Sequence, residues 1–197
     1  MKLERSFYER ETILVAKELL GKYLVRSTEE GITSGKIVEV EAYIGPHDAA
    51  AHTFNNLRTS RTEVVYGPGG YAYVYLIYGM YHCLNIVTNT AEKPEVVLIR
   101  ALEPTDGIEL MKKRRKCEKL KNLCSGPGKL CIAMDITRMH NGIDLCGNEL
   151  YLLDNSKVPE ENIISTPRIN IDYAGEAKNY PWRFVIKDSK YLSVPIK

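Results

Sequence analysis

The chain has 197 residues, and its 44% hydrophobic content is enough to build one sizeable core. Lys and Arg exceed Asp and Glu by only 27 to 25, so the net charge of +2 neither demands nor excludes a polyanionic partner. Five cysteines without a C-x-x-C pair argue against a disulfide framework and a zinc site, and they favour reduced thiols in a cytoplasmic protein. We expect neither a signal peptide nor a membrane span, because the sequence lacks the apolar runs that each requires.

Apolar periodicity and breaker residues divide the chain into short elements. The predicted helices span residues 9–20, 108–123 and 125–134. The predicted strands span residues 23–26, 37–43, 71–77, 82–88, 96–101, 182–186 and 191–194. Between them we expect a turn at 27–35 and a loop with a short helix at 47–66. No repeat or linker divides the sequence, so we predict one α+β domain over residues 1–197, with a mostly antiparallel curved β-sheet, peripheral helices and a protruding β-hairpin.

The strand at 37–43 brings two carboxylates close together. Because side chains alternate in a strand, Glu39, Glu41 and Tyr43 share one face and the residues between them face the core. Two carboxylates on a partly enclosed face repel each other, and the pKa of at least one should then be raised. A solvated outer face is the simpler interpretation of this pattern. The nearby Tyr43 and the break at Gly45-Pro46 instead favour a strand that ends at a cleft.

Two histidines and an aspartate follow in the next loop. His47, Asp48 and His52 could together bind a metal, but their spacing matches no helical H-E-x-x-H pattern. We therefore predict no metal, and we favour a His52 that lines a pocket or caps a loop.

Tyrosines are concentrated in one part of the chain. Of 13 tyrosines, six lie between positions 66 and 81, and Tyr71, Tyr73 and Tyr75 share one face of the predicted strand. Cross-strand aromatic packing explains some of them. The same ring faces could also stack on an extruded base, with each stack contributing about 1–3 kcal/mol.

The turn after this strand is unusually apolar. Hairpin turns favour Asn, Asp and Gly, whereas this turn carries Tyr78, Met80 and Tyr81 around Gly79. Large apolar groups on a projecting turn reduce solubility unless they insert into a partner. A wedge between stacked bases and an anchor for another protein are the two alternatives.

Four further features are ambiguous by themselves. Asn85 and Arg100 could be ordinary structural hydrogen-bonding residues. The five consecutive positive charges at 112–116 are typical of a solvated helix, and phosphate contact is the less favoured alternative. The turn before the last predicted helix could place the backbone of Gly128 and the side chain of Lys129 against a phosphate. A plain turn is an equal alternative, and the spacing of a Walker loop is absent.

In order along the chain, these motifs resemble the alkyladenine (3-methyladenine) DNA glycosylase family. The resemblance covers roughly residues 5 to 195 and is carried by VEVEAYIGP at 38–46, AH at 51–52, YVYLIYGMY at 73–81, LIRALEP at 98–104, GPGKLC at 126–131 and YAGE at 173–176. Each motif is weak alone, whereas the ordered set is specific. The sequence departs from many relatives at Gly69-Gly70 and lacks a long basic N-terminal extension, and Tyr173 occupies a position that varies in the family.

The resemblance implies a DNA repair enzyme that flips an alkylated or deaminated purine out of double-stranded DNA and hydrolyses its glycosidic bond. It implies that Glu41 is the general base, that Arg100 holds the water together with a carbonyl near Ile171, and that no cofactor takes part. Tyr43 would stack on one face of the base, with His52 and Tyr75 on the other and Asn85 at the pocket floor, where it would exclude the exocyclic amine of guanine. Tyr78 would fill the gap in the duplex, flanked by Met80 and Tyr81.

Because no lysine stands at a nucleophile position, the resemblance implies hydrolysis without strand cleavage. We expect a monomer, since one flipped base needs no second subunit. Three alternatives stay open from the residues alone: a non-catalytic nucleic-acid binding module, a metallohydrolase built on His47, Asp48 and His52, and a protein-interaction domain.

Overall fold

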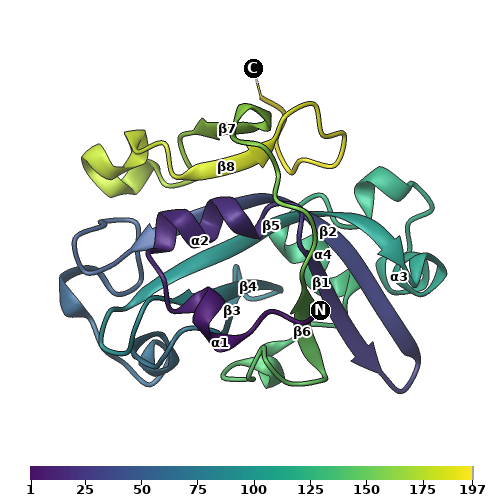
Figure 1. The fold of residues 1–197 in the computed structure, drawn as a ribbon, viewed down its shortest axis with the longest axis horizontal. Helices are drawn as coiled ribbons and strands as arrows, with labels where there is room; N and C mark the ends of the chain where they lie inside the picture. The colour runs from purple at the N-terminus through teal and green to yellow at the C-terminus, as the bar shows by residue number, and fades with distance from the viewer. Residues whose placement is uncertain (197) are drawn as a thin grey trace.

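The structure, a computed structural model, describes residues 1–196, which form an eight-stranded antiparallel sheet with short helices around it (Figure 1). The strands are β1 (Tyr23–Thr28), β2 (Gly31–Ile44), β3 (Ala72–Ile77), β4 (Tyr81–Thr88), β5 (Glu95–Asp106), β6 (Leu150–Leu153), β7 (Ile163–Thr166) and β8 (Arg183–Ile186). The α-helices are α1 (Arg5–Tyr8), α2 (Thr12–Leu19), α3 (Ile108–Arg115) and α4 (Pro127–Ala133). Short 3-10 helices are η1 (Phe54–Asn56), η2 (Glu63–Tyr66), η3 (Leu120–Asn122), η4 (Arg138–His140), η5 (Glu160–Asn162) and η6 (Asp172–Asn179). The predicted α+β class is confirmed.

Strand β2 organises the sheet, because it is long enough to pair with three other strands. It pairs with β5 along one edge, and along the other edge it pairs first with β1 and then with β8. Near this change of partner the register between β2 and β5 shifts twice, which leaves Val38 and Arg100 without a directly opposite residue. Such bulges bend a strand and redirect its side chains. They place Arg100 beside both acidic residues of β2.

The main core lies between the sheet and the helices. Helix α2 packs on β2 and β5, whereas α4 packs on β4 and β5 (Figure 1). The apolar face of α2, which includes Val15, Ala16 and Leu19, is completely buried. Among the described residues, no helix is both long enough and apolar enough to cross a bilayer.

Several predicted boundaries are wrong. The helix predicted at 9–20 is the shorter α2 at Thr12–Leu19, and α1 at Arg5–Tyr8 was not predicted. The turn predicted at 27–35 is only Glu29 and Glu30, between β1 and β2. The helix predicted at 108–123 ends at Arg115, because Lys116 adopts a left-handed conformation with φ of 49° after a run of like charges. Residues 191–194 form no strand, and their backbone instead contacts charged side chains of β2 and β8.

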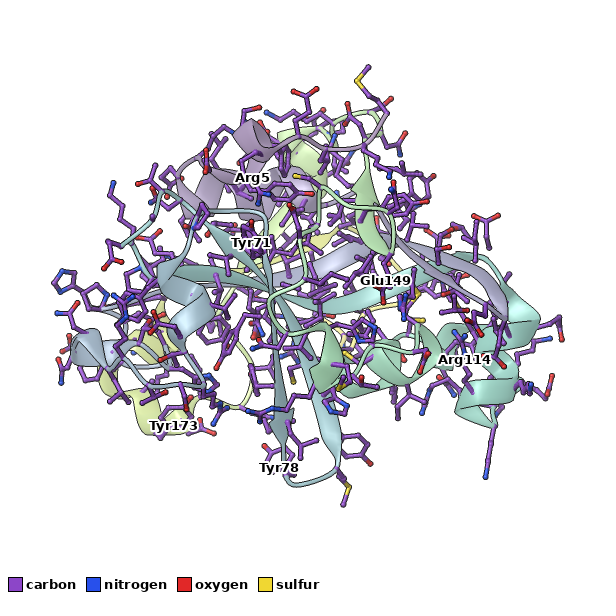
Figure 2. All side chains as sticks on the ribbon, turned by 90° about the horizontal axis from the view of Figure 1, so that it is seen from below. Arg5, Tyr71, Tyr78, Arg114, Glu149 and Tyr173 are labelled. Carbon is purple, nitrogen blue, oxygen red and sulfur yellow. The ribbon has the colours of Figure 1, made fainter. Side chains whose placement is uncertain are left out.

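The hairpin of β3 and β4 is confirmed, and its tip projects from the body of the protein, where Figure 2 labels Tyr78. Tyr78 and Gly79 have φ values of 53° and 70°, and the N–H of Met80 donates to the carbonyl of Ile77 at 3.2 Å. This is the geometry of a tight hairpin turn that normally favours Asn or Gly at its first central position. A tyrosine at this position is therefore strained, by about 1–3 kcal/mol.

Candidate active site

A cavity of about 730 Å³ opens beside the hairpin, and its walls come from β2, β3, β4, β5 and the loops before η1, α4 and η6. Of the residues predicted for the site, all except Glu41 and Met80 line this cavity; those that do are Tyr43, His52, Tyr75, Tyr78, Tyr81, Asn85, Arg100, Gly128, Lys129 and Ile171. They come from segments far apart in the sequence, so the fold brings the predicted set together. Their individual roles stay predictions.

Glu41 lies directly behind the cavity wall and is completely buried. Its Oε1 accepts a hydrogen bond from the backbone N–H of Ile169 at 2.7 Å. Its Oε2 accepts from the Tyr43 hydroxyl at 2.8 Å and from Arg100 Nη1 at 3.2 Å. A carboxylate offers about four acceptor positions, so these three donors leave room for one water molecule. The donors themselves line the cavity, so a water molecule held there would stand between Glu41 and a ligand.

Glu39 is also completely buried, so the alternative of a solvated outer face for the two glutamates is wrong. Burial alone would raise the pKa of Glu39, but the charge of Arg100, the hydrogen bonds from Ser193 and the charge of Arg183 together lower it. The predicted rise in the pKa of one glutamate is therefore wrong for Glu39. The sequence indicated Arg100 of β5 but not its contact with Glu39, and it did not indicate Arg183 of β8.

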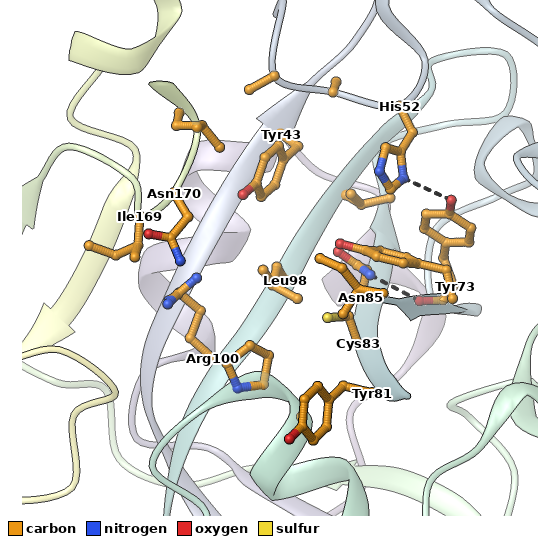
Figure 3. A pocket seen from close by; sticks show the side chains of 18 of the residues that line it. Tyr43, His52, Tyr73, Tyr81, Cys83, Asn85, Leu98, Arg100, Ile169 and Asn170 are labelled. Carbon is orange, nitrogen blue, oxygen red and sulfur yellow. Dashed lines mark hydrogen bonds between the residues drawn. The ribbon is translucent and has the colours of Figure 1, made fainter. Parts of the chain in front are cut away.

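Tyr43 forms one side wall of the cavity (Figure 3). Burial and the neighbouring Glu41 carboxylate raise its pKa well above the ordinary value, so the phenol stays protonated and donates to Glu41. The guanidinium of Arg168 lies 4.7 Å from the centre of the Tyr43 ring and 5.1 Å from that of Trp182. Arg168 is held in turn by both carboxylate oxygens of Asp48, at 2.5 and 2.8 Å. The position of Tyr43 is therefore fixed by buried charged groups.

The opposite wall includes His52 and Tyr73 (Figure 3), and Tyr75, which packs against His52, completes it. The rings of His52 and Tyr75 meet edge to face at 4.7 Å, and His52 Nδ1 lies 3.0 Å from the Tyr73 hydroxyl. His52 is exposed at the cavity mouth, yet the protein around its ring and the charge of Arg61 lower its pKa to about 4. At neutral pH this wall is therefore uncharged and aromatic, which suits a flat ligand.

Asn85 is buried on β4 at the inner end of the cavity. Its side-chain nitrogen donates to the backbone carbonyl of Tyr73 at 3.1 Å, as the dashed line in Figure 3 shows. The carboxamide is thus fixed in place and can discriminate between ligands by shape and hydrogen bonding.

The hairpin tip and an opposite loop form the rim of the cavity. Tyr78 and Met80 are 76% and 64% exposed, and Met80 does not line the cavity. Tyr173 of η6 is 72% exposed and lies on the same side of the molecule as Tyr78 (Figure 2). Tyr78 and Tyr173 therefore present exposed aromatic rings at the cavity mouth, and Met80 lies beside Tyr78 at the hairpin tip.

Gly128 lies at the start of α4, where its exposed neighbour Lys129 also borders the cavity. A Cβ atom on Gly128 would stand 3.0 Å from three atoms of the Tyr81 side chain. The glycine therefore lets the Tyr81 ring pack against the helix, a role that differs from the predicted phosphate contact and does not exclude it.

Ile171 is buried in a small cluster with Ala50 and Ala174 that packs against Tyr43. Its carbonyl oxygen accepts from the N–H of Ala174 at 2.9 Å. The neighbouring Ile169, which the sequence did not indicate, supplies the N–H that binds Glu41. Sequence reasoning also missed Asp48, Arg168, Arg183 and Ser193 as supports of the site, since none of them lies in a recognisable local pattern.

The metal site considered for His47, Asp48 and His52 does not form. Asp48 is buried and uses its carboxylate for Arg168 and for the N–H groups of Ile44 and Ala50, whereas His47 is exposed. Within residues 1–196 no group of three or more His, Cys, Asp or Glu side chains is arranged to hold a metal ion.

A buried carboxylate behind an aromatic cavity is the geometry that the motif resemblance implied, and comparison with known sequences bears on it directly. The sequence model of the methylpurine-DNA glycosylase family matches residues 6–190. The chain belongs to this family. The family resemblance predicted from the motifs is thereby confirmed.

Relatives in this family match the chain over its whole length. A protein of Alkaliphilus oremlandii, whose assigned name is 3-methyladenine DNA glycosylase, is 53% identical over 98% of this chain and 99% of its own length. Proteins with the same assigned name from Clostridium acetobutylicum and Bacillus mycoides are 54% and 51% identical, over 98% of this chain in both cases and over 98% and 100% of their own lengths.

Proposed function

We propose that this glycosylase excises alkylated and deaminated purines from double-stranded DNA, and that it works as a monomer built from one domain over residues 1–197. The observation that carries the proposal is the buried carboxylate of Glu41 directly behind an aromatic cavity. A cavity of about 730 Å³ is within the usual range for a small-molecule site, roughly 300–1,000 Å³, and its flat aromatic walls suit a base.

The damaged nucleotide leaves the duplex and its base enters between Tyr43 on one side and His52 and Tyr75 on the other. Enzymes that act on a base within duplex DNA extrude it in this way. Tyr78 at the exposed hairpin tip occupies the space that the base leaves, flanked by Met80 and Tyr81, and stacking there offsets part of the unstacking cost. Gly128 and Lys129 lie at the rim, where Lys129 contacts a phosphate.

Hydrolysis then proceeds at C1′ of the flipped nucleotide. Glu41 accepts a proton from water as the water oxygen bonds to C1′, and the bond between C1′ and the purine nitrogen breaks with its electron pair on the base. Arg100, together with a carbonyl near Ile171, orients the water. A cationic alkylated base leaves as a neutral molecule, whereas a neutral deaminated base must gain a proton as it leaves. The product in both cases is an abasic site in an unbroken strand.

Asn85 selects the base by excluding the exocyclic amine of guanine from the inner end of the cavity. The substrate also sets where the protein acts: we expect it with the chromosome, which in a bacterium means the cytoplasm.

Base release from defined duplexes tests this proposal. The substrates are duplexes with one hypoxanthine or one etheno-adenine, together with methylated DNA, and alkali converts each abasic site into a strand break. Wild type should release the base, and Glu41→Gln should reduce release by about 10²–10⁴-fold while it retains DNA binding. Binding without release by wild type on all three substrates would instead support a non-catalytic nucleic-acid binding module.

A further inference from the structure

Glu39 does not line the cavity, yet its carboxylate is one of the most constrained groups near it. The side chain is completely buried and receives four hydrogen bonds: from Arg100 Nε at 2.9 Å, Arg183 Nε at 2.8 Å, Ser193 Oγ at 2.7 Å and the backbone N–H of Ser193 at 2.6 Å. A buried charge needs such partners. Their arrangement, however, also determines how Arg100 meets Glu41.

Arg100 is divided between several acceptors. Its Nε binds Glu39, its Nη1 binds Glu41 at 3.2 Å and its Nη2 binds Ser193 Oγ at 3.1 Å. An arginine left alone with one carboxylate prefers a bidentate pair with two short hydrogen bonds. Here Glu39 holds one edge of the guanidinium, so Glu41 receives only one longer bond from it. An acceptor position on Glu41 thus stays available for water.

The charges around the two glutamates are balanced. Glu39 and Glu41 on β2 face Arg100 on β5 and Arg183 on β8. On the other side of Glu41 stand the neutral Tyr43 and, behind its ring, Arg168, which is neutralised by Asp48. Loss of the Glu39 charge would leave Glu41 facing an excess of positive charge, which weakens a carboxylate as a base.

The end of the chain completes this arrangement. Ser193 binds Glu39 through both its N–H and its hydroxyl, and the carbonyl of Val194 accepts from Arg183 Nη2 at 2.5 Å. The irregular segment at 191–194, which the sequence predicted as a strand, therefore clamps Glu39 and Arg183 from outside the cavity lining.

We propose that Glu39 is a positioning residue for the glycosylase reaction: with Ser193 it holds Arg100 away from a bidentate pair with Glu41 and so keeps Glu41 able to activate water. This inference rests on the proposed function. It assigns a role to Glu39, which does not line the cavity.

The test compares single-turnover base release by wild type, Glu39→Gln, Glu39→Asp and Ser193→Ala across a range of pH. Methylated DNA is the substrate, because its cationic lesions need no protonation and the loss of activity toward low pH then reports on Glu41. Glu103→Gln is the matched control, since Glu103 lies on β5, the strand paired with that of Glu39, and binds Lys36 of β2 outside the cavity. Thermal unfolding and DNA binding are measured for each variant.

Glu39→Gln should release base about 10- to 100-fold more slowly than wild type, with DNA affinity unchanged. A rate loss of this size is usual when a catalytic group is slightly misplaced. Its activity should also persist to lower pH than that of wild type, because removal of a neighbouring negative charge favours the charged form of a carboxylate. Glu39→Asp keeps the charge and should return the pH profile to that of wild type with partial recovery of the rate. Glu103→Gln should behave as wild type.

A folded Glu39→Gln with an unchanged rate, or with a slower rate and an unchanged pH profile, would overturn the inference. If Glu39→Gln does not fold, Ser193→Ala decides: it should slow release about 3- to 10-fold at unchanged DNA affinity, and a wild-type rate would refute the clamp. Failure of wild type to release any base would refute the proposed function instead, so the two failures are distinguishable.

Discussion

At and behind the cavity wall, Glu39, Glu41 and Arg100 form a floor of buried, hydrogen-bonded side chains, whereas at the hairpin tip Tyr78 and Met80 are 76% and 64% exposed. The floor is organised before any ligand arrives, so little reorganisation is needed when charge develops on the reacting sugar. The tip carries backbone strain and exposed apolar surface that nothing within the described chain covers. Changes at the floor should therefore affect stability and chemistry together, and changes at the tip should affect function alone.

The largest expected effect comes from breaking a buried charge pair beside the floor. Asp48→Asn leaves Arg168 buried without its counter-charge, so we expect a loss of about 3–5 kcal/mol in the free energy of unfolding, measured with urea. Glu160→Gln, which removes an exposed pair with Lys17, is the control and should cost less than about 1 kcal/mol. Equal losses in the two variants would mean that the Asp48 pair is not part of a pre-organised floor.

The tip should behave in the opposite way. Tyr78→Gly relieves a left-handed tyrosine, so its stability should equal that of wild type or exceed it by about 1 kcal/mol. Base release should nevertheless fall by roughly 5- to 150-fold, because the loss of one stacking ring is worth about 1–3 kcal/mol. Single-turnover rates and thermal unfolding measure the two effects on the same samples.

Ile32→Ala is a suitable control for this variant, because Ile32 is an apolar residue, 54% exposed, on the other long hairpin of β1 and β2. Its base release should be unchanged. If Tyr78→Gly loses stability and keeps its activity, the assignment of the tip to DNA is wrong.

The hairpin tip and part of the floor were predictable from the sequence. The hairpin, the aromatic residues and Glu41 each belong to local patterns, and an apolar turn around Gly79 is visible without a structure. The helix at 108–123 was predicted too long, because periodicity does not register a left-handed residue such as Lys116.

The supports of the floor could not be predicted in the same way. Arg168 and Asp48 are 120 residues apart, and Ser193 and Glu39 are 154 residues apart. Each of these side chains has an ordinary sequence environment, and its partner is decided by how β2, β5 and β8 pair. The two bulges that direct Arg100 toward both glutamates also arise from tertiary pairing, for which a single sequence carries no direct signal.

A smaller effect tests how the tip is joined to the body. Gly128→Ala places a methyl group 3.0 Å from the Tyr81 side chain, and Tyr81, which is 43% exposed, can shift outward to accommodate it. We expect a stability loss below about 1 kcal/mol and base release within about 3-fold of wild type. A fall in base release as large as that of Tyr78→Gly would show that the position of Tyr81 is set more tightly than its exposure indicates.

The smallest effect concerns pH and His52 at the boundary between floor and rim. The pKa of His52 is about 4 in the folded chain against an ordinary value of 6.5, so between these pH values the unfolded chain binds more protons than the folded one. The contribution of His52 to stability is therefore fully present above pH 6.5 and is lost as the pH falls toward 4. Since the ring is exposed to solvent, this contribution should stay below about 1 kcal/mol.

Urea unfolding at pH 7 and pH 5 measures this contribution. The free energy of unfolding should decrease more between these pH values for wild type than for His52→Gln, which has no imidazole to titrate. An equal decrease in both proteins would mean that the ring is solvated as in the unfolded chain, and His52 would then belong with the exposed rim rather than with the ordered wall opposite Tyr43.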